Sequence, residues 1–482
     1  MQTQVELIEQ IALLRQENAF LKEELAQLKR MIFGSKKERF IPVDSAQGLL
    51  FDANQEEVEP EIEEIAYSRE KPSKKNKAKR LLLPAHLPRK EEIIEPENLT
   101  ENSARIGEKI TEVLEYTPGK FFVTKTVRPV YKQKTGEMRV AELPTQVIPN
   151  GNAGASILAY LMVSKFIDHL PYYRQVQIFK RDGMKIPEST ISGWFKKTCQ
   201  LLEPLYELMS SHISTSDYIQ ADESPIPVLS SQKPGSTHKG YQWVFLLPKA
   251  EMVIFQYHQS RGKSVPKDVL KGFKGCLQTD GYAGYHELGQ SKDITHIGCM
   301  AHARRKFDVA KENDLALASH ALKLIQQVYA IEREIEEEEL SAEEALQIRE
   351  NQAVPVLDKL KKWMEEQYPN VLPKSAIGKA ISYTLKQWPL LIGYIQNGQW
   401  KIDNNGVENK IRPLALGRKN YLFAGSHEAA QQASMMYSFF GTCKLNDIEP
   451  LQWLTETLRK IPDHKVNRLN ELLPLKKQGE IS

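Results

Sequence analysis

DYIQADESPIPVL (217–229) is an apolar, strand-like run that carries two adjacent acids, Asp222 and Glu223. The tyrosine, isoleucine, valine and leucine around the acids favour a β-strand. Successive side chains of a strand point to opposite faces, so only one of the two acids can face a given site. We assign that position to Asp222. Glu223 is the alternative, and a turn-capping role before Pro225 is the other reading of Asp222.

A second acid closes the next apolar run of this kind. GCLQTDGY (275–282) reads as a strand that ends at Asp280. The pair Asp280–Gly281 is also a common turn sequence, and taken alone that structural reading is the simpler one. The site reading is favoured once Asp222 and Glu408 are considered with it, because one metal-dependent mechanism needs all three acids.

A third acid stands far downstream, in DNNGVENKIRPLALGRKNYLFAGS (403–426). Glu408 follows two asparagines, and Asn404 or Asn405 is a typical N-cap for a helix that contains it. The alternative role for Glu408 is an i,i+4 ion pair with Arg412, worth a few tenths of a kcal/mol.

Three separated carboxylates on one scaffold predict a metal site. Mg²⁺ and Mn²⁺ prefer oxygen ligands, and Mg²⁺ is held by a few carboxylates together with substrate phosphates. Two such ions about 4 Å apart can activate an attacking hydroxyl and stabilise a leaving oxygen in phosphoryl transfer. The sequence therefore predicts that Asp222, Asp280 and Glu408 hold two Mg²⁺ (or Mn²⁺) ions.

Residues 217–308 alternate between strand and helix patterns, including a hairpin over 241–258 and a strand-to-helix passage in THIGCMAHARRKF (295–307). The following residues, 311–400, are rich in Leu, Glu, Lys and Ala and predict a helical insertion. The simplest reading of the acids in that insertion, Glu332 among them, is a solvated helix face.

Several segments, in their order along the chain, resemble the DDE transposases of bacterial insertion sequences, specifically the insertion-sequence-66 family. They are FGSKKERF (33–40), LPAHLPRKE (83–91), LPYYRQVQIFKRDG (170–183), ADESPIPV (221–228), TDGYAGY (279–285), CMAHARRKF (299–307) and the 403–426 stretch. The resemblance implies an RNase H-like core, with the first acid on the first strand, the second on the fourth, and the third after a helical insertion.

The resemblance also implies a reaction, in which metal-activated water cuts DNA at the ends of the chain's own mobile element. The freed 3′-hydroxyl would then attack target DNA. Asp222, Asp280 and Glu408 occupy the catalytic positions. Three alternatives are a degenerate protein that only binds element ends, an RNase H-like nuclease without strand transfer, and a coiled-coil scaffold, which leaves the acids unexplained.

The bulk composition constrains location and partners. There are 65 Lys plus Arg against 62 Asp plus Glu, a net charge of +3, so any DNA-binding basicity is local. Four separated cysteines, without a CxxC pair, indicate a reducing compartment rather than a disulfide framework. The longest apolar run, 155–163, is too short to span a bilayer. We expect a cytoplasmic, nucleoid-associated bacterial protein without membrane contact.

Residues 4–32 show a heptad repeat with leucine at every d position and a single Asn at an interior a position. Such an Asn fixes the register of parallel dimers. The pattern predicts a homodimer or higher oligomer, and an amphipathic helix packed on its own globular body is the alternative. The predicted dimerisation residues are Leu7, Ile11, Leu14, Asn18, Leu21, Leu25 and Leu28.

The region between this helix and the core has a charged part followed by a strand-like part. An acidic run (52–64) and a basic run (71–80) predict a disordered charged linker, which touches phosphate backbone or simply remains solvated. Residues 83–148 alternate like strands. The resembled family usually has a zinc module here, but residues 92–135 contain no cysteine or histidine. Because zinc needs about four such ligands, we predict no zinc in this module.

Residues 154–213 read as helices separated by Gly183, which suggests a helix-turn-helix, with an ordinary helical bundle as the alternative. Further cations follow the second and third acids, and their alternative is a solvated or ion-paired surface. The predicted DNA-contacting residues are Ser189, Thr190, Lys196, Lys197, His302, Arg304, Arg305, Arg412, Arg418 and Lys419. Accessory proteins from the same element are further expected partners, as the resemblance implies.

Together these patterns predict a multidomain α/β chain with an RNase H-like core. The expected parts are a coiled coil (1–40), a charged linker (41–82), a small β-rich module (83–150), a helix-turn-helix-like DNA-binding segment (151–214), the first part of the core (215–310), a helical insertion (311–400), the completion of the core (401–445) and a helical tail (446–482).

Overall fold

The structure is a computed structural model. It describes residues 119, 121–127, 130–132, 138–140, 145–149, 151–229 and 235–476. These residues belong to one compact unit, residues 67–482. The predicted coiled coil and charged linker lie outside the described residues. Of the predicted β-rich module, the short strands β1 (Val130–Lys132) and β2 (Met138–Val140) are described, and they pair antiparallel.

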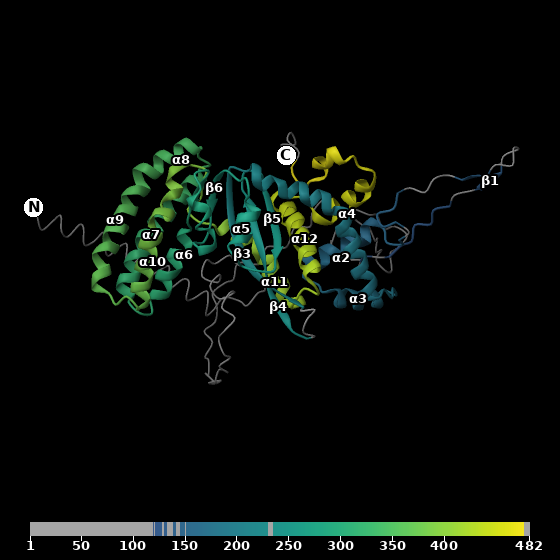
Figure 1. Cartoon of the computed structure of the whole chain (residues 1–482), viewed down its shortest axis with the longest axis horizontal. Helices are drawn as coiled ribbons and strands as arrows, with labels where there is room; N and C mark the ends of the chain where they lie inside the picture. The colour runs from purple at the N-terminus through teal and green to yellow at the C-terminus, as the bar shows by residue number, and fades with distance from the viewer. Residues whose placement is uncertain are drawn as a thin grey trace, which may run out of the picture. The chain divides into compact units, whose positions relative to one another are not determined.

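A five-stranded mixed sheet forms the centre of the fold (Figure 1). Its strands are β3 (Tyr218–Leu229), β4 (Thr237–Leu247), β5 (Met252–His258), β6 (Gly275–Gln278) and β7 (Ile294–Ile297). The spatial order is β5-β4-β3-β6-β7, with β3, β4 and β5 antiparallel and β6 and β7 parallel to β3. The predicted hairpin is the β4–β5 pair.

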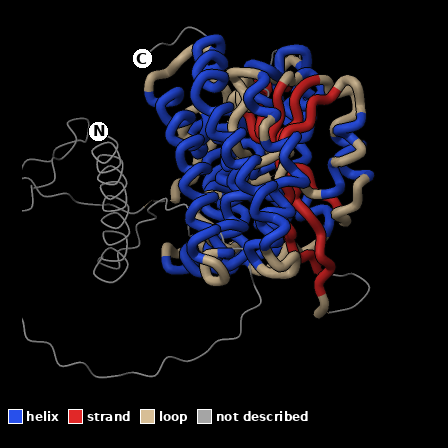
Figure 2. Tube along the Cα trace, turned by 90° about the vertical axis from the view of Figure 1, so that its left-hand side faces the viewer, coloured by secondary structure: helices blue, strands red, loops and turns tan. Residues whose placement is uncertain are grey.

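Strand β4 explains why the sheet is covered on both faces. Six consecutive residues at its end, 242–247, are buried, and a strand without polar alternation must be packed on both sides. The ladder between β3 and β4 continues as far as Leu229 and Thr237. In Figure 2 this hairpin extends beyond the helices.

Helices from both ends of the described chain cover one side of the sheet. They are α2 (Ala155–Phe166), α3 (Tyr172–Arg181), α4 (Glu188–Thr215), α12 (His427–Leu445) and α13 (Pro450–Lys460), followed by the 3₁₀ turns η7 (Ile461–Asp463) and η8 (Val466–Leu472). The apolar faces of these helices and of the sheet form one continuous core.

Hydroxyl groups of α12 complete the hydrogen bonding of the edge strand β5. Ser438 Oγ accepts from Phe255 N at 2.8 Å, and Thr442 Oγ1 accepts from Val253 N at 3.1 Å. An uncovered edge strand leaves its backbone groups open to other chains, and here a helix side-chain row satisfies two of them.

The predicted helix stop at Gly183 is confirmed. Helix α3 ends at Arg181, and Gly183 has φ +84°, a conformation that glycine adopts without steric cost. The next helix, α4, begins at Glu188 after Pro187, so Ser189 and Thr190 lie in its first turn.

The segment predicted as a helical insertion consists of helices with a core of their own. It follows α6 (Met300–Ala310) and includes α7 (Leu315–Glu337), α8 (Ala342–Ile348), the π-helical turn η4 (Arg349–Ala353), α9 (Val354–Gln367), η5 (Tyr368–Asn370), α10 (Ala376–Leu391) and η6 (Gly393–Gln396). The chain then returns to the sheet as α11 (Asn405–Tyr421). Short helical pieces between the core strands are α5 (Ser264–Val269), η2 (Ala283–Tyr285) and η3 (Leu288–Gln290).

One interpretation of the insertion was wrong. Glu332 does not belong to a solvated face, because it is 7% exposed and pairs with the buried guanidinium of Arg349 at 2.7 Å. Among the described residues, no helix is both long and apolar enough to cross a membrane.

Candidate active site

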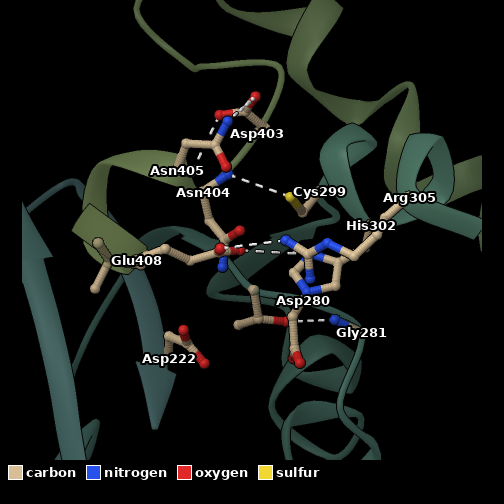
Figure 3. A network of polar contacts seen from close by, with 12 residues as sticks. Asp222, Asp280, Gly281, Cys299, His302, Arg305, Asp403, Asn404, Asn405 and Glu408 are labelled. Carbon is tan, nitrogen blue, oxygen red and sulfur yellow. Dashed lines mark hydrogen bonds and ion pairs between the residues drawn. The ribbon is translucent and has the colours of Figure 1, made fainter. Parts of the chain in front are cut away.

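Three elements, distant in sequence, bring the predicted acids to one region of the sheet (Figure 3). Asp222 lies on β3, Asp280 follows the last residues of β6, and Glu408 lies in the first turn of α11. Strands β3 and β6 are parallel neighbours, with Gln220 opposite Gln278. Each acid follows its glutamine by two residues, and the two carboxylates are close enough for Asp280 to affect the pKa of Asp222.

The two adjacent acids of β3 have different surroundings. Both carboxylate oxygens of Glu223 have partners within the protein. Arg261 Nη2 lies 2.5 Å from Glu223 Oε1, and Tyr285 OH donates to Glu223 Oε2 at 3.2 Å. Asp222 accepts a hydrogen bond from Glu223 N at 2.8 Å, and Figure 3 shows it in the same region as Asp280 and Glu408.

Asp280 has both of the roles that the sequence suggested, because it forms a turn with Gly281 and also lies near the other two acids. Its Oδ1 accepts from Tyr282 N at 2.8 Å, and Gly281 has φ +88°, so the Asp-Gly pair does form a turn. Tyr383 of the insertion donates to the Asp280 carbonyl oxygen at 3.2 Å. These contacts fix the backbone of Asp280 just beyond the end of β6.

Glu408 is almost fully buried, with 7% of its surface exposed. His302 Nδ1 lies 3.8 Å from its Oε1, and Arg305 Nη2 lies 3.5 Å from its Oε2. Desolvation raises the pKa of Glu408, and the nearby Arg305 guanidinium partly opposes that shift. The predicted helix cap is confirmed in part, because Asn404 is the N-cap residue but makes no side-chain capping bond.

The electrostatics of the site reflect crowded negative charge. Burial, followed by the neighbouring carboxylates of Glu223, Asp280 and Glu408, raises the pKa of Asp222 well above its usual value. Like charges in a poorly hydrated site disfavour ionisation of each other. Oxygen donors of this kind fit a hard divalent cation, which would relieve the repulsion.

Two buried glutamines, which sequence reasoning missed, hold the third acid against the sheet. Gln220 Nε2 donates to Gln278 Oε1 at 2.9 Å and to the Asp403 carbonyl oxygen at 3.1 Å, while its Oε1 accepts from Val407 N at 3.2 Å. Gln278 Nε2 donates to the Lys401 carbonyl oxygen at 2.8 Å. The segment that leads into Glu408 is therefore fixed directly to β3 and β6.

A signal for these glutamines was present in the sequence. Both strands carry the same Gln-x-Asp pattern, as Gln220–Ala221–Asp222 and Gln278–Thr279–Asp280. An amide at a buried strand position needs several hydrogen-bond partners. The repeat of this pattern before both acids identifies the amides as part of the same site.

A buried thiol joins the two helices that flank Glu408. Cys299 precedes α6, and its Sγ accepts from Asn404 N, at the start of α11, at 3.5 Å. Nearby, Met300 N donates to the Ile402 carbonyl oxygen at 3.1 Å. These contacts keep the start of α6 beside the start of α11.

The residues predicted to contact DNA fall into separate places. His302 and Arg305 lie at Glu408, within the acidic site. Arg304 is exposed on α6, with its guanidinium carbon 5.9 Å from the ring centroid of Tyr329. On α4, Ser189, Lys196 and Lys197 are exposed and Thr190 is half-buried. Lys196 also forms an ion pair with Glu428 at 2.9 Å.

The three cations of α11 differ in exposure. Arg418 donates a hydrogen bond to the Pro225 carbonyl oxygen and is half-buried, so its guanidinium helps to hold α11 on β3. Arg412 is half-buried and Lys419 is exposed. The structure does not gather all the predicted DNA-contacting residues into one patch.

The sheet order and the gathered acids define a mixed α/β protein with a carboxylate-based centre of the kind that suits divalent cations. The chain belongs to the IS66 family of transposases: residues 150–432 match the family described as "Transposase IS66 family", and residues 438–475 match the "IS66 C-terminal element". Residues 20–91 match a segment described as "Transposase C of IS166 homeodomain". The family predicted from the sequence is confirmed.

Similar proteins extend over most of the chain but carry no functional description. An uncharacterized protein of Sinorhizobium fredii, y4jD, is 32% identical over 483 residues, which is 94% of each chain. A second one from that organism, y4hP, is 31% identical over 396 residues, covering 77% of this chain and 71% of its own. No solved structure matches the chain.

Proposed function

We propose that the protein catalyses metal-dependent cleavage and strand transfer of DNA at the ends of its own insertion sequence. The observation that carries this proposal is the meeting of Asp222, Asp280 and Glu408, from β3, the end of β6 and α11, in one group where the other two carboxylates raise the pKa of Asp222. Membership of the IS66 transposase family supplies the substrate class.

The sheet supports an RNase H-like assignment for the core. The resemblance places the first acid on the first strand of the core and the second on the fourth. Counted along the sheet-forming chain, β3 is the first strand and β6 the fourth, and the two are adjacent and parallel. The third acid returns after a helical insertion, as that assignment requires.

The chain's own residues would divide the work as follows. Asp222, Asp280 and Glu408 would hold two Mg²⁺ or Mn²⁺ ions, which supply charge stabilisation at the attacking and leaving oxygens. Arg305, which is half-buried and ion-paired with Glu408, would contact a phosphate oxygen at the same site. The glutamine network keeps Glu408 at a fixed distance from the two strand acids, and such positioning is a large part of catalysis in phosphoryl transfer.

Binding of DNA would extend beyond the acidic site. Lys197 on α4 and Lys419 on α11 are exposed cations, and Lys196 of α4 pairs with Glu428 at the start of α12. We propose that Lys197 and Lys419 contact the phosphate backbone. Two element ends must be held together, which gives the predicted dimerisation through residues 4–32 a purpose. We also propose that accessory proteins from the same element are partners and that the protein is associated with the bacterial nucleoid.

The first test measures cleavage of labelled DNA that carries the parent element's ends, in Mg²⁺, by wild type and Glu408→Gln. Loss of second-shell support around a metal costs about 10–100-fold, so loss of a ligand should lower the rate by more than about 100-fold while end binding persists. Glu287→Gln is the matched control, because Glu287 is exposed and pairs with Lys263. Undiminished cleavage by Glu408→Gln would make Glu408 structural.

A second test separates a transposase from a nuclease that only cuts. A pre-cut element end with a free 3′-hydroxyl is incubated with supercoiled target DNA, and joined products are counted. Joining that disappears in Asp222→Asn supports strand transfer. Cutting without joining would favour an RNase H-like nuclease, and end binding without either reaction would favour a degenerate DNA-binding protein.

A further inference from the structure

Beside the two strand acids, Glu408 has a second set of neighbours of a different chemical kind. Cys299 Sγ, a ring nitrogen of His302 and a carboxylate oxygen of Glu408 all lie within 4.8 Å of one another. Cys299 and Glu408 are buried, at 2% and 7% exposure. One sulfur, one nitrogen and one oxygen donor that converge at this spacing can ligate a single ion.

Several buried polar atoms near this cluster lack hydrogen-bond partners among the described residues, and a bound cation would give some of them a partner. His302 Nδ1 is buried and has no hydrogen-bond partner among the described residues, and the same holds for both amide atoms of Asn404, a side chain with no exposed surface. Figure 3 shows the Asn404 side chain directed toward the Glu408 carboxylate. Buried polar atoms without partners are uncommon and are often explained by an ion or water.

Burial and the carboxylates of Asp403 and Glu408 raise the pKa of the Cys299 thiol, so a bound cation is what would stabilise its thiolate. The thiol stands at the start of α6, where the helix dipole favours negative charge. Its Sγ accepts the backbone N–H of Asn404 at 3.5 Å, and such outer contacts orient metal-ligating groups. On binding, the thiol would give its proton to solvent and ligate as the thiolate.

We propose that Cys299, His302 and Glu408 form a site for one borderline divalent cation, Zn²⁺ or Co²⁺, distinct from the hard ions assigned to the three acids. Sulfur and imidazole donors select these metals over Mg²⁺, which prefers oxygen ligands. Because Glu408 is shared, an ion bound here withdraws Glu408 from Asp222 and Asp280. The site is therefore inhibitory, a consequence that rests on the proposed function, whereas the binding itself does not.

The binding test uses the full chain without DNA. Co²⁺ is titrated into metal-free protein, and the thiolate-to-cobalt absorption band is followed, with Zn²⁺ then added to displace it. One equivalent should bind, with affinity lowered at least about tenfold in Cys299→Ser and in His302→Gln. Cys199→Ser, which alters another buried cysteine, should bind like wild type. The absence of a thiolate band, or equal binding by Cys299→Ser and wild type, would overturn the proposal.

Inhibition is then measured in the Mg²⁺ cleavage assay, with each protein normalised to its own activity without Zn²⁺. The half-inhibitory Zn²⁺ concentration should rise at least about tenfold in Cys299→Ser relative to wild type. Equal inhibition of the two proteins would overturn the inhibitory role. If neither protein cleaves DNA under any condition, the proposed function fails, while the cobalt titration still decides the metal site.

Discussion

At the scale of single residues, the site depends on uncharged side chains as much as on its acids. Gln220 and Gln278 are buried on the two strands that carry Asp222 and Asp280, and their amides bind the backbone that leads into Glu408. Each amide has fixed donors and acceptors, so it allows one arrangement of the returning chain. The third acid is thereby placed by a network without net charge.

Replacing Gln220 by leucine tests this network. The change leaves Val407 N–H and the Asp403 carbonyl without their partner, and each buried unsatisfied group costs about 1–3 kcal/mol. We expect the free energy of unfolding to fall by about 2–4 kcal/mol in urea denaturation. Gln431→Leu, at an exposed position of α12, should change it by less than about 0.5 kcal/mol. Equal effects of the two changes would contradict the role of the network.

Removing one of the crowded charges should stabilise the metal-free protein. In chelator, Asp222→Asn relieves repulsion among buried carboxylates and should raise the free energy of unfolding by about 1 kcal/mol. Added Mg²⁺ should then raise the Tm of wild type more than that of the variant, because the variant has lost a ligand. Thermal melts in chelator and in Mg²⁺ measure both effects.

Asp217→Asn is the matched control for that experiment, since Asp217 is exposed and pairs with Lys249 on the surface. It should leave both the metal-free Tm and the Mg²⁺ response nearly unchanged. A destabilised Asp222→Asn with an undiminished Mg²⁺ response would mean that Asp222 is a structural residue.

At the scale of elements, the sequence was most informative where the local sequence pattern alone determines secondary structure. Gly183 and the apolar runs of β3 and β6 identified the end of a helix and the two strands that carry acids. The pairing of β3 with β6 joins strands separated by a hairpin and a helix, so its register was not readable from local pattern. Glu332 was misread for the same reason, because its partner Arg349 lies on another element.

Arg349 connects three parts of the insertion and supports a prediction at this scale. Its guanidinium holds Glu332 through two contacts, at 2.9 and 2.7 Å, and donates to the carbonyl oxygens of Asn397 and Trp400. Arg349→Met leaves Glu332 as a buried, unpaired charge, which should lower the free energy of unfolding by about 3–5 kcal/mol. Chemical denaturation of the single variant gives this value.

The double variant Arg349→Met with Glu332→Leu should recover much of that loss, because it removes the stranded charge. Lys361→Met is the control for loss of a cation, since Lys361 pairs with Glu365 on an exposed helix face at 3.8 Å. Its effect should stay below about 1 kcal/mol. A double variant less stable than Arg349→Met would show that the carbonyl contacts, and not the ion pair, dominate.

At the scale of the whole described unit, the C-terminal segment packs against the first helix of that unit, α2. Helix α13 packs against α2, and Leu454 and Leu458 belong to the core shared with the sheet. Asn446 Nδ2 donates to the Glu251 carbonyl oxygen at 2.9 Å, and Trp453 Nε1 donates to the Leu472 carbonyl oxygen at 3.0 Å. The family match at 438–475 covers this segment.

This packing predicts that the C-terminal segment and the sheet unfold together. Leu458 has no exposed surface, so Leu458→Ala removes buried methyl groups and leaves a cavity that costs about 2–5 kcal/mol. Val466→Ala, at a position that is 80% exposed, should cost less than about 0.5 kcal/mol. Tryptophan fluorescence and far-ultraviolet circular dichroism should follow the same transition in both proteins, shifted to lower denaturant only in Leu458→Ala. If instead the fluorescence of Leu458→Ala changed well before its circular dichroism, the segment would be detaching alone, and the helices at the two ends of the described chain would not share one cooperative core.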